Sequence, residues 1–346
     1  MRILFFRSAF GTVLQRGGTA LCVLVLRLPT GLQIMAELKD ETNVEQGTIN
    51  PDVEHLLLIG EPLEIYDAFG YSELNRYLEE VAQVSAGFSD EVKRAILERR
   101  DAHKPRLILT NDATFQFVDR WDVYDESETP PGSFALLQLR GVMRSQSGLS
   151  TPGVDRLVQD LRAAYNNKNV EAVVIETNSG GGESLAGTIL KSGIQERNKP
   201  VIGFAHLAAS AAMRALSGAD EIIASGEGSE FGSIGTMFTL DAKFLNKYRA
   251  RFADFYGATA PKKNSDFRSA IAGDFSTIQQ RADEKTAAFQ NEIRRERPLK
   301  GSEKMIAETL DGSMFAAMES KRRGLIDGIG TMQYAIKRAR ALKTKY

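Results

Sequence analysis

The sequence predicts an α/β protein whose core is a mostly parallel sheet, with an α+β region ahead of that core. Three observations support this class. After residue 131, short apolar runs alternate with segments of helical periodicity. Small-residue motifs follow two of these runs, and the composition changes at an acidic, Pro/Gly-rich stretch over residues 125–132. Strands that alternate with helices form βαβ units, and such units build parallel sheets.

The composition limits the possible chemistry. The chain has 346 residues, of which 42% are hydrophobic and 26% charged, as in a folded protein of one large or two smaller domains. Its net charge of −1 argues against a nucleic-acid-binding protein. The single cysteine, Cys22, excludes an intrachain disulfide and a cysteine-based zinc site, and His55, His103 and His206 are too far apart for an HExxH pair. Catalysis would therefore depend on Ser, Thr, Lys, Asp, Glu, Tyr or a bound cofactor.

Residues 1–36 differ from the rest because they contain four arginines and no acidic residue. Their most apolar run, residues 20–26, is far shorter than the roughly 20 residues that span a bilayer. Three interpretations remain open: a secretory or membrane-directing segment, an organelle transit peptide, or a spurious extension ahead of Met35. We expect an extension outside the core. Membrane association has no support beyond these residues, so a soluble protein is favoured over a membrane-anchored one.

The region before the core is predicted from weaker signals. Residues 37–50 are polar and expected to lack structure, residues 72–100 have helical periodicity, and residues 106–122 predict short strands. The stretch at 125–132 then marks a boundary. We therefore expect three parts, namely an extension over 1–36, an α+β region over 37–130 and the core over 131–340.

Within the core the elements follow one another at regular spacing. Predicted strands cover residues 134–139, 172–175, 199–204 and 221–224, and predicted helices cover 154–165, 184–196 and 210–218. A further helical stretch over 279–300 carries dense mixed charge. We expect this stretch to present a solvated face that also packs on a neighbouring subunit.

Two motifs lie directly after predicted strands, where ligands bind in α/β folds. The first is Asn-Ser-Gly-Gly-Gly-Glu over 178–183, whose glycines allow a close backbone approach to a ligand or, more simply, a tight strand–helix turn. The second is His-Leu-Ala-Ala-Ser-Ala-Ala-Met over 206–213, which places Ser210 at a helix start between small neighbours. Such a serine is either a nucleophile or an ordinary helix cap.

Together, and in this order, the motifs resemble those of the signal peptide peptidase A (SppA) family of serine proteases, and more distantly the Clp protease and crotonase superfamily. The family has a Ser-Pro-Gly-Gly turn and an Ala-Ser-Gly-Gly-Tyr helix start, which correspond here to residues 179–182 and 209–213. Further matches cover the Gly-Val-Met end of the first core strand and the segments 230–235, 310–315 and 324–330. The resemblance covers about residues 132–340 and implies a Clp/crotonase-like core of repeated ββα units.

Three departures from the family pattern surround the active-site motifs. Gly180 stands where proline is usual, Ala211 and Ala212 replace the two glycines, and Met213 replaces a common tyrosine. They affect substrate preference most directly.

The resemblance also implies roles for individual residues. Ser210 corresponds to the nucleophile, and the backbone N–H groups of Gly181 and Ala211 correspond to the oxyanion hole. Every histidine precedes Ser210, so a Clp-type histidine base has no candidate in the usual order. The SppA family uses lysine instead, which corresponds to Lys262 or, as the alternative, Lys263. Ser233 corresponds to the serine that orients the lysine amine.

Simpler interpretations stand beside these roles: a solvated loop lysine, a turn serine, and for His206 a residue at the end of its strand. The implied function is a Ser–Lys endopeptidase that needs no metal or cofactor, acts on polypeptides and forms a homo-oligomer. Its substrates would be signal-peptide remnants or, in a phage-type member, capsid and scaffold proteins. The alternatives are a crotonase-fold acyl-handling enzyme, which would need neither Ser210 nor a lysine near 262, and an inactive assembly protein of the same fold.

Overall fold

The computed structural model describes residue 94, residues 103–110, 114–118, 121–147, 152–240, 245–246 and 253–346, and the backbone of five strands between residues 5 and 65. The chain divides into two compact units, one made of Met1–Glu54 and Leu78–Phe88 and the other of His55–Tyr77 and Ser89–Tyr346. Most of the predicted polar stretch 37–50 and of the predicted helices over 72–100 lies outside the described residues.

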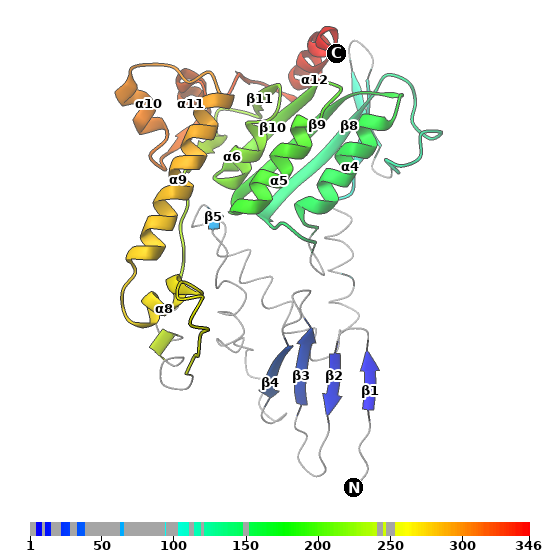
Figure 1. Cartoon of the computed structure of the whole chain (residues 1–346). Coiled ribbons are helices and arrows are strands. Elements are labelled where there is room, and N and C mark those ends of the chain that lie inside the picture. Colours follow the sequence, from blue (N-terminus) through cyan, green and yellow to red (C-terminus); the bar gives the residue numbers. More distant parts are fainter. Residues whose placement is uncertain are drawn as a thin grey trace. The chain divides into compact units, whose positions relative to one another are not determined.

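The first unit contains two antiparallel hairpins (Figure 1). Strand β1 (Phe5–Ser8) pairs with β2 (Gly11–Leu14), and β3 (Cys22–Arg27) pairs with β4 (Gln33–Leu38). Residues 1–36 thus contribute strands to this unit, while their classification as an extension outside the core stays a prediction.

The second unit is built on a ten-stranded sheet. Its centre consists of β8 (Ser133–Met143), β9 (Val170–Glu183) and β10 (Val201–Ala209), which run parallel to one another. Strands β11 (Glu221–Ala224) and β12 (Glu230–Gly232) are also parallel to β10. These pairings confirm the predicted α/β class with a mostly parallel sheet.

Helices cover both faces of this sheet because its strands are apolar on both faces. Alternate residues of β8 point to opposite sides, so Leu137 joins one buried cluster and Leu136 the other. Helices α4 (Val154–Asn166), α5 (Ser184–Gln195) and α6 (Ala211–Leu216) belong to the first cluster and lie in front of the strands in Figure 1. Helix α12 (Met332–Leu342) covers the second cluster.

The predicted strands and helices of the core are all present, with two informative differences. The glycine run, predicted as a turn, continues β9 as far as Glu183, because Gly181 and Gly182 pair with the end of β8. On its other side this extension pairs antiparallel with β5 (Leu63–Ile65). Strand β10 also continues past its predicted end, to Ala209. Both extensions lead directly to the candidate site.

The strands before the predicted boundary belong to the same sheet. Strand β6 (Arg106–Thr110) pairs antiparallel with β8 and with β7 (Phe115–Val118). The division expected at residues 130 and 131 therefore falls inside the second unit. Composition marks the exposed turn between β7 and β8, but it does not reveal hydrogen bonds that form across that turn.

The chain after β12 is mostly helical. It comprises α8 (Ser265–Ile271), α9 (Ser276–Glu296), α10 (Glu303–Thr309), β13 (Met314–Ala316), α11 (Ala317–Arg323), β14 (Gly328–Ile329), α12 and η1 (Lys343–Lys345). Helix α9 is mostly exposed, as its charge predicts, but it buries Phe289 and Ile293. Among the described residues, none of the helices has the length and apolar character needed to cross a membrane.

Candidate active site

Ser210 occupies a strained position between β10 and α6. Its backbone dihedrals are φ 54° and ψ −120°, a conformation that residues other than glycine rarely adopt. Hydrogen bonds hold it there, since its N–H donates to the Gly232 carbonyl at 2.8 Å and its own carbonyl accepts from the Arg214 N–H at 3.0 Å. A serine on a sharp strand-to-helix turn is typical of nucleophiles in hydrolases.

The glycine run lies beside Ser210 on the neighbouring strand. Ala208 of β10 is opposite Ser179 of β9 in the last pair between these two strands, and Ser210 follows two residues later. The Ser179 hydroxyl donates to the Gly141 carbonyl at 2.6 Å and accepts from the Gly181 N–H at 3.1 Å. The sequence placed Ser179 within a motif but gave it no role of its own, and the structure shows it fastening the run to β8.

The two predicted oxyanion donors differ in their surroundings. Ala211 is the first residue of α6, where a backbone N–H has no carbonyl partner within the helix. Gly187 of α5 permits close packing there, because a β-carbon on it would lie 2.8 Å from the Ala211 carbonyl oxygen. The Gly181 N–H, in contrast, already donates to the Ser179 hydroxyl. To stabilise an oxyanion it would have to leave this hydrogen bond or divide its proton between the two acceptors.

Ser233 lies next to the residue that accepts the Ser210 hydrogen bond. Its φ is 51°, and its N–H donates to the Ser313 carbonyl at 2.9 Å. Gly232 before it has no room for a side chain, since a β-carbon would lie 2.2 Å from the same carbonyl oxygen. The structure therefore brings Ser210 and Ser233 together at the ends of two adjacent strands.

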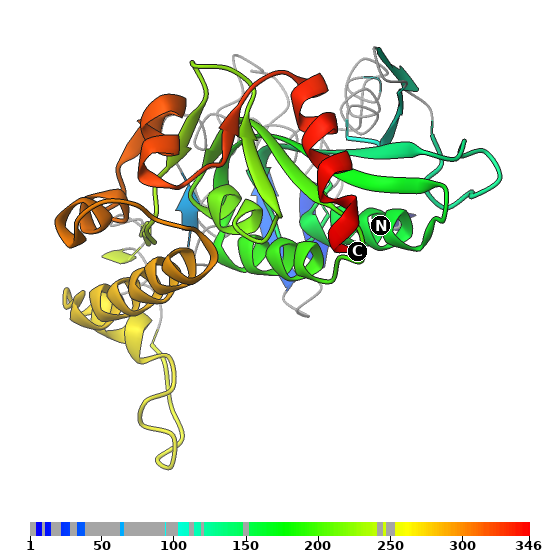
Figure 2. The ribbon, with the colours of Figure 1, turned by 90° about the horizontal axis from the view of Figure 1, so that it is seen from above.

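The two candidate lysines make no contact with the pair Ser210 and Ser233 among the interactions of the described residues. Lys262 and Lys263 lie on exposed turns just before α8, in the loop that extends away from the sheet in Figure 2. Within the described residues, no hydrogen bond or ion pair connects either lysine to Ser210 or Ser233. The assignment of a lysine base stays a prediction, and it requires movement of this loop or a loop from another copy.

A lysine with a strongly perturbed pKa occurs elsewhere in the chain. Burial lowers the pKa of Lys199 to about 8. Its amine donates to the carbonyl of Ala164 in the last turn of α4 at 3.0 Å, to that of Asn167 just after the helix, and to that of Val170 at the start of β9 at 2.8 Å. Lys199 precedes β10, whereas Ser210 follows it, so this lysine caps a helix at the opposite end of the strand.

Arg214 was not singled out from the sequence, although it is buried one turn after Ser210. Its guanidinium donates to the Ser184 hydroxyl at 2.8 Å, lies 3.3 Å from the Glu292 carboxylate and stacks 4.1 Å above the Phe289 ring. It thereby ties α6 to α5 and α9. An arginine within an otherwise small, apolar helix was the available sequence signal.

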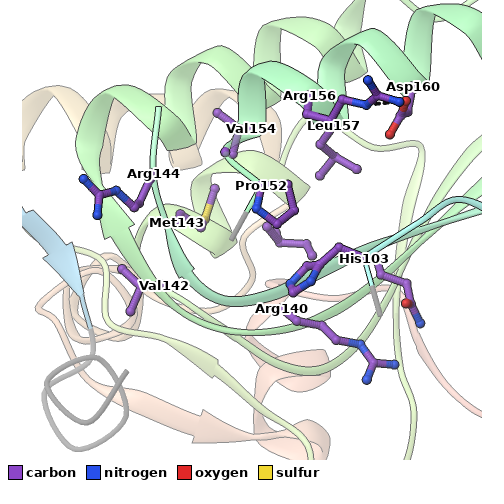
Figure 3. A pocket seen from close by; sticks show the side chains of 13 residues that line it. His103, Arg140, Val142, Met143, Arg144, Pro152, Val154, Arg156, Leu157 and Asp160 are labelled. Carbon is purple, nitrogen blue, oxygen red and sulfur yellow. Dashed lines mark ion pairs between the residues drawn. The ribbon is translucent and has the colours of Figure 1, made fainter. Parts of the chain in front are cut away.

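A pocket opens beside the extended end of β8 (Figure 3). Val142 and Met143 line it and also pair with Gly181 and Gly182, so it adjoins the glycine run. Apolar side chains mix with charged ones around it. Its lining residues are His103, Gln138, Leu139, Arg140, Val142, Met143, Arg144, Pro152, Gly153, Val154, Arg156, Leu157 and Asp160.

One acid of this pocket is buried and well partnered. Asp160 accepts from the Tyr124 hydroxyl at 2.9 Å and lies 3.2 Å from the Arg156 guanidinium. Burial raises the pKa of Asp160, which the hydrogen bond from Tyr124 partly offsets. The Asp160 carboxylate at this end of the pocket therefore already has partners within the protein.

Comparison with known proteins finds similarity to serine peptidases. The family model "Peptidase family S49" matches residues 194–345, the part that contains Ser210 and Ser233. "Protease 4" of Haemophilus influenzae is 26% identical over 260 residues, covering 73% of this chain and 41% of that protein. "Serine protease SPPA, chloroplastic" of Arabidopsis thaliana is 25% identical over 273 residues, covering 72% and 38%. Residues 194–345 thus resemble peptidase family S49, and the chain as a whole is similar to these SppA-type proteases; it spans about two fifths of the length of these curated relatives.

Solved structures show more distant similarity. A membrane-bound stomatin-specific protease matches with 16% identity and a TM-score of 0.33, over 59% of this chain and 81% of that one. An enoyl-CoA hydratase/isomerase family protein from Hyphomonas neptunium has the same identity and TM-score, over 61% and 71%.

Gly182→Ala tests whether the close approach of β9 and β8 matters. A β-carbon at this position would lie 2.1 Å from the Met143 carbonyl oxygen and 2.6 Å from its nitrogen, so backbone must shift. We expect a loss of stability of about 3 kcal/mol, measured by thermal and urea unfolding. Gly228→Ala is the control, because nothing lies within 4 Å of its β-carbon. Equal unfolding midpoints for the two variants would contradict the contact.

Proposed function

We propose that the chain is a serine endopeptidase in which Ser210 is the nucleophile, Lys262 or Lys263 is the base and Ser233 orients the lysine amine. The observation that carries the proposal is the strained turn at Ser210, which follows directly on the strand that pairs with the start of the glycine run at Ser179. Strain of this kind costs about 1–3 kcal/mol and persists where the surrounding structure enforces it, commonly at functional sites.

The reaction follows from these positions. A neutral lysine takes the proton of the Ser210 hydroxyl, and Oγ attacks the carbonyl carbon of a peptide bond. The N–H groups of Ala211 and Gly181 stabilise the oxyanion, and each such donor is typically worth about 3 kcal/mol of barrier. The leaving amine takes the proton from the lysine, and water then hydrolyses the acyl-enzyme with the lysine again as base. No step uses a metal or an organic cofactor.

The substrate would bind as an extended polypeptide. The end of β9 at Gly181–Glu183 pairs antiparallel with β5, and a substrate strand would take this edge by displacing β5. The pocket lined by Val142 and Met143, which pair with Gly181 and Gly182, would then receive a substrate side chain. Signal-peptide remnants and phage capsid or scaffold proteins are the two substrate classes that we propose.

The lysine assignment is tested with Lys262→Ala and Lys263→Ala in the full chain, assayed on denatured casein. We expect one of them to lower kcat at least about a hundredfold, as loss of a general base does, and the other to match the wild type. Both lysines are exposed, so neither variant should alter the unfolding midpoint. Full activity of both single variants and of the double variant would rule out a base from this loop.

Complementation distinguishes the two routes to a complete dyad. If the lysine comes from another copy of the chain, mixing an inactive Ser210→Ala protein with the inactive lysine variant restores part of the activity. If the loop closes on its own core, the mixture stays inactive. The first result would also support the proposed homo-oligomer.

The crotonase-type alternative makes a different prediction. An acyl-handling enzyme that uses only backbone oxyanion donors would not require the Ser210 hydroxyl. Retention of an acyl-CoA reaction in Ser210→Ala, with no peptidase activity in the wild type, would favour it. An inactive assembly protein would show neither activity.

A further inference from the structure

Strand β10 contains an irregularity four residues before Ser210. Ala205 is opposite Thr177 of β9 and Leu207 is opposite Asn178, so His206 is an extra residue without a cross-strand partner on that side. Such a residue is a β-bulge, and bulges commonly redirect a strand next to a functional site. The predicted end of the strand at this residue is replaced by a bulge within it.

The second neighbour of β10 changes at the same residue. Up to Ala205 the strand pairs with β11, and from Leu207 it pairs with β12. His206 therefore lies where one neighbouring strand stops and the next begins. The loop that joins these two neighbours, residues 225–229, passes the same point.

The His206 side chain is about half exposed and makes polar contacts at this junction. Its Nδ1 lies 2.7 Å from the Ser225 hydroxyl, and Ser225 lies 3.1 Å from the Ser229 hydroxyl. Its Nε2 lies 3.6 Å from the Glu176 carboxylate on β9. The imidazole thus links β9, β10 and the start and end of the loop that leads into β12.

Glu176 is itself held firmly in the ionised form. It accepts hydrogen bonds from Gln138 at 2.7 Å and Arg140 at 2.9 Å, both on β8. Burial works to raise the pKa of Glu176, but the hydrogen bonds from Arg140, Gln138 and His206 lower it below the ordinary value. The network therefore begins on β8 and crosses the sheet to the β11–β12 loop.

The bulge decides which side of the sheet the following residues face. In a regular strand, residues 205 and 208 would point to opposite faces because the side-chain period is two. Here Ala205 and Ala208 belong to the same buried cluster. One extra residue has exchanged the faces, and Ser210 follows two residues after Ala208.

We propose that His206 is a positioning residue: with Ser225 and Glu176 it holds the bulge in β10, and the bulge sets where Ser210 lies. The expected effect of His206 on catalysis rests on the proposed function. The expected effect on the position of the Ser210 backbone does not, because the same network holds the start of β12, whose Gly232 carbonyl accepts the Ser210 N–H.

The test compares His206→Leu, which removes the hydrogen bonds, with His206→Gln, which retains a donor and an acceptor. The first readout is hydrogen exchange of the Ser210 amide, which does not depend on activity. We expect exchange to accelerate about tenfold or more in His206→Leu and to stay near the wild-type rate in His206→Gln. Ser225→Ala and Ser225→Thr form a second pair, in case His206→Leu does not fold.

The second readout is casein cleavage. A small misplacement of a nucleophile lowers kcat by about ten- to a hundredfold, so we expect this loss in His206→Leu and Ser225→Ala with KM nearly unchanged. Rescue is expected in His206→Gln and Ser225→Thr. Arg338→Gln is the matched control, because Arg338 binds Glu221 at the far end of β11. It should alter neither readout.

Two results would overturn the proposal. One is wild-type amide exchange at Ser210 in both His206→Leu and Ser225→Ala. The other is equal acceleration in His206→Leu and His206→Gln, which would mean that ring volume rather than hydrogen bonding matters. If the wild type lacks Ser210-dependent cleavage, the proposed function fails, while the exchange data still decide the role of His206.

Discussion

Replacing Ser210 with alanine is expected to lower kcat for casein cleavage by about 10⁴-fold or more, because the attacking oxygen is lost. The fold should persist, since the backbone hydrogen bonds to Gly232 and from Arg214 do not involve the side chain. Steady-state cleavage and circular dichroism of the same preparation measure the two effects. Undiminished cleavage would remove Ser210 from the mechanism.

The backbone at Ser210 provides an independent check with a second substitution. Ser210→Gly should be as inactive as Ser210→Ala, yet more stable by about 1 kcal/mol, because only glycine adopts φ 54°, ψ −120° without steric cost. The matched pair separates strain from chemistry. If the alanine variant unfolds at the higher temperature, the turn is not strained in solution.

Replacing Glu292 with glutamine is expected to destabilise the protein by about 3 kcal/mol, since breaking a buried ion pair leaves a charge poorly compensated. The Glu292 carboxylate lies 2.6 Å from the Lys191 amine and 3.3 Å from the Arg214 guanidinium, and both cations are only 5% exposed. Thermal unfolding monitored by circular dichroism measures the loss. Because this carboxylate ties α9 to α5 and α6, a lower kcat should accompany it.

The control for this substitution is a solvent-exposed ion pair on the protein surface. Lys304 and Glu308 are 3.9 Å apart, with side chains 87% and 49% exposed, so Glu308→Gln should change stability by less than about 0.5 kcal/mol. Similar unfolding midpoints for the two variants would mean that solvent screens Glu292 as well. The burial of Phe289 and Ile293 and the second ion pair, Glu296 with Lys191, would then be the contacts that hold α9 against α5 and α6.

Periodicity predicted the central strands and helices because each buries one repeating face. Helix α4 begins at Val154 and strand β11 covers Glu221–Ala224, as the apolar spacing indicates. The extent of β9 and β10 was underestimated. Glycines and alanines have little strand propensity, and only pairing with β8, β5 and β12 makes those residues strands.

The sequence by itself determined the α/β class, the SppA-like motifs and the identity of Ser210, Ser233 and the glycine run as candidates. These features reside in local spacing, which a single chain displays. Only the tertiary structure decided that the Ser210 N–H bonds to the Gly232 carbonyl, that Ser179 holds the Gly181 N–H, and that β10 has a bulge at His206. Each of these depends on the register between strands far apart in sequence, and register is set by hydrogen bonds and packing that form on folding.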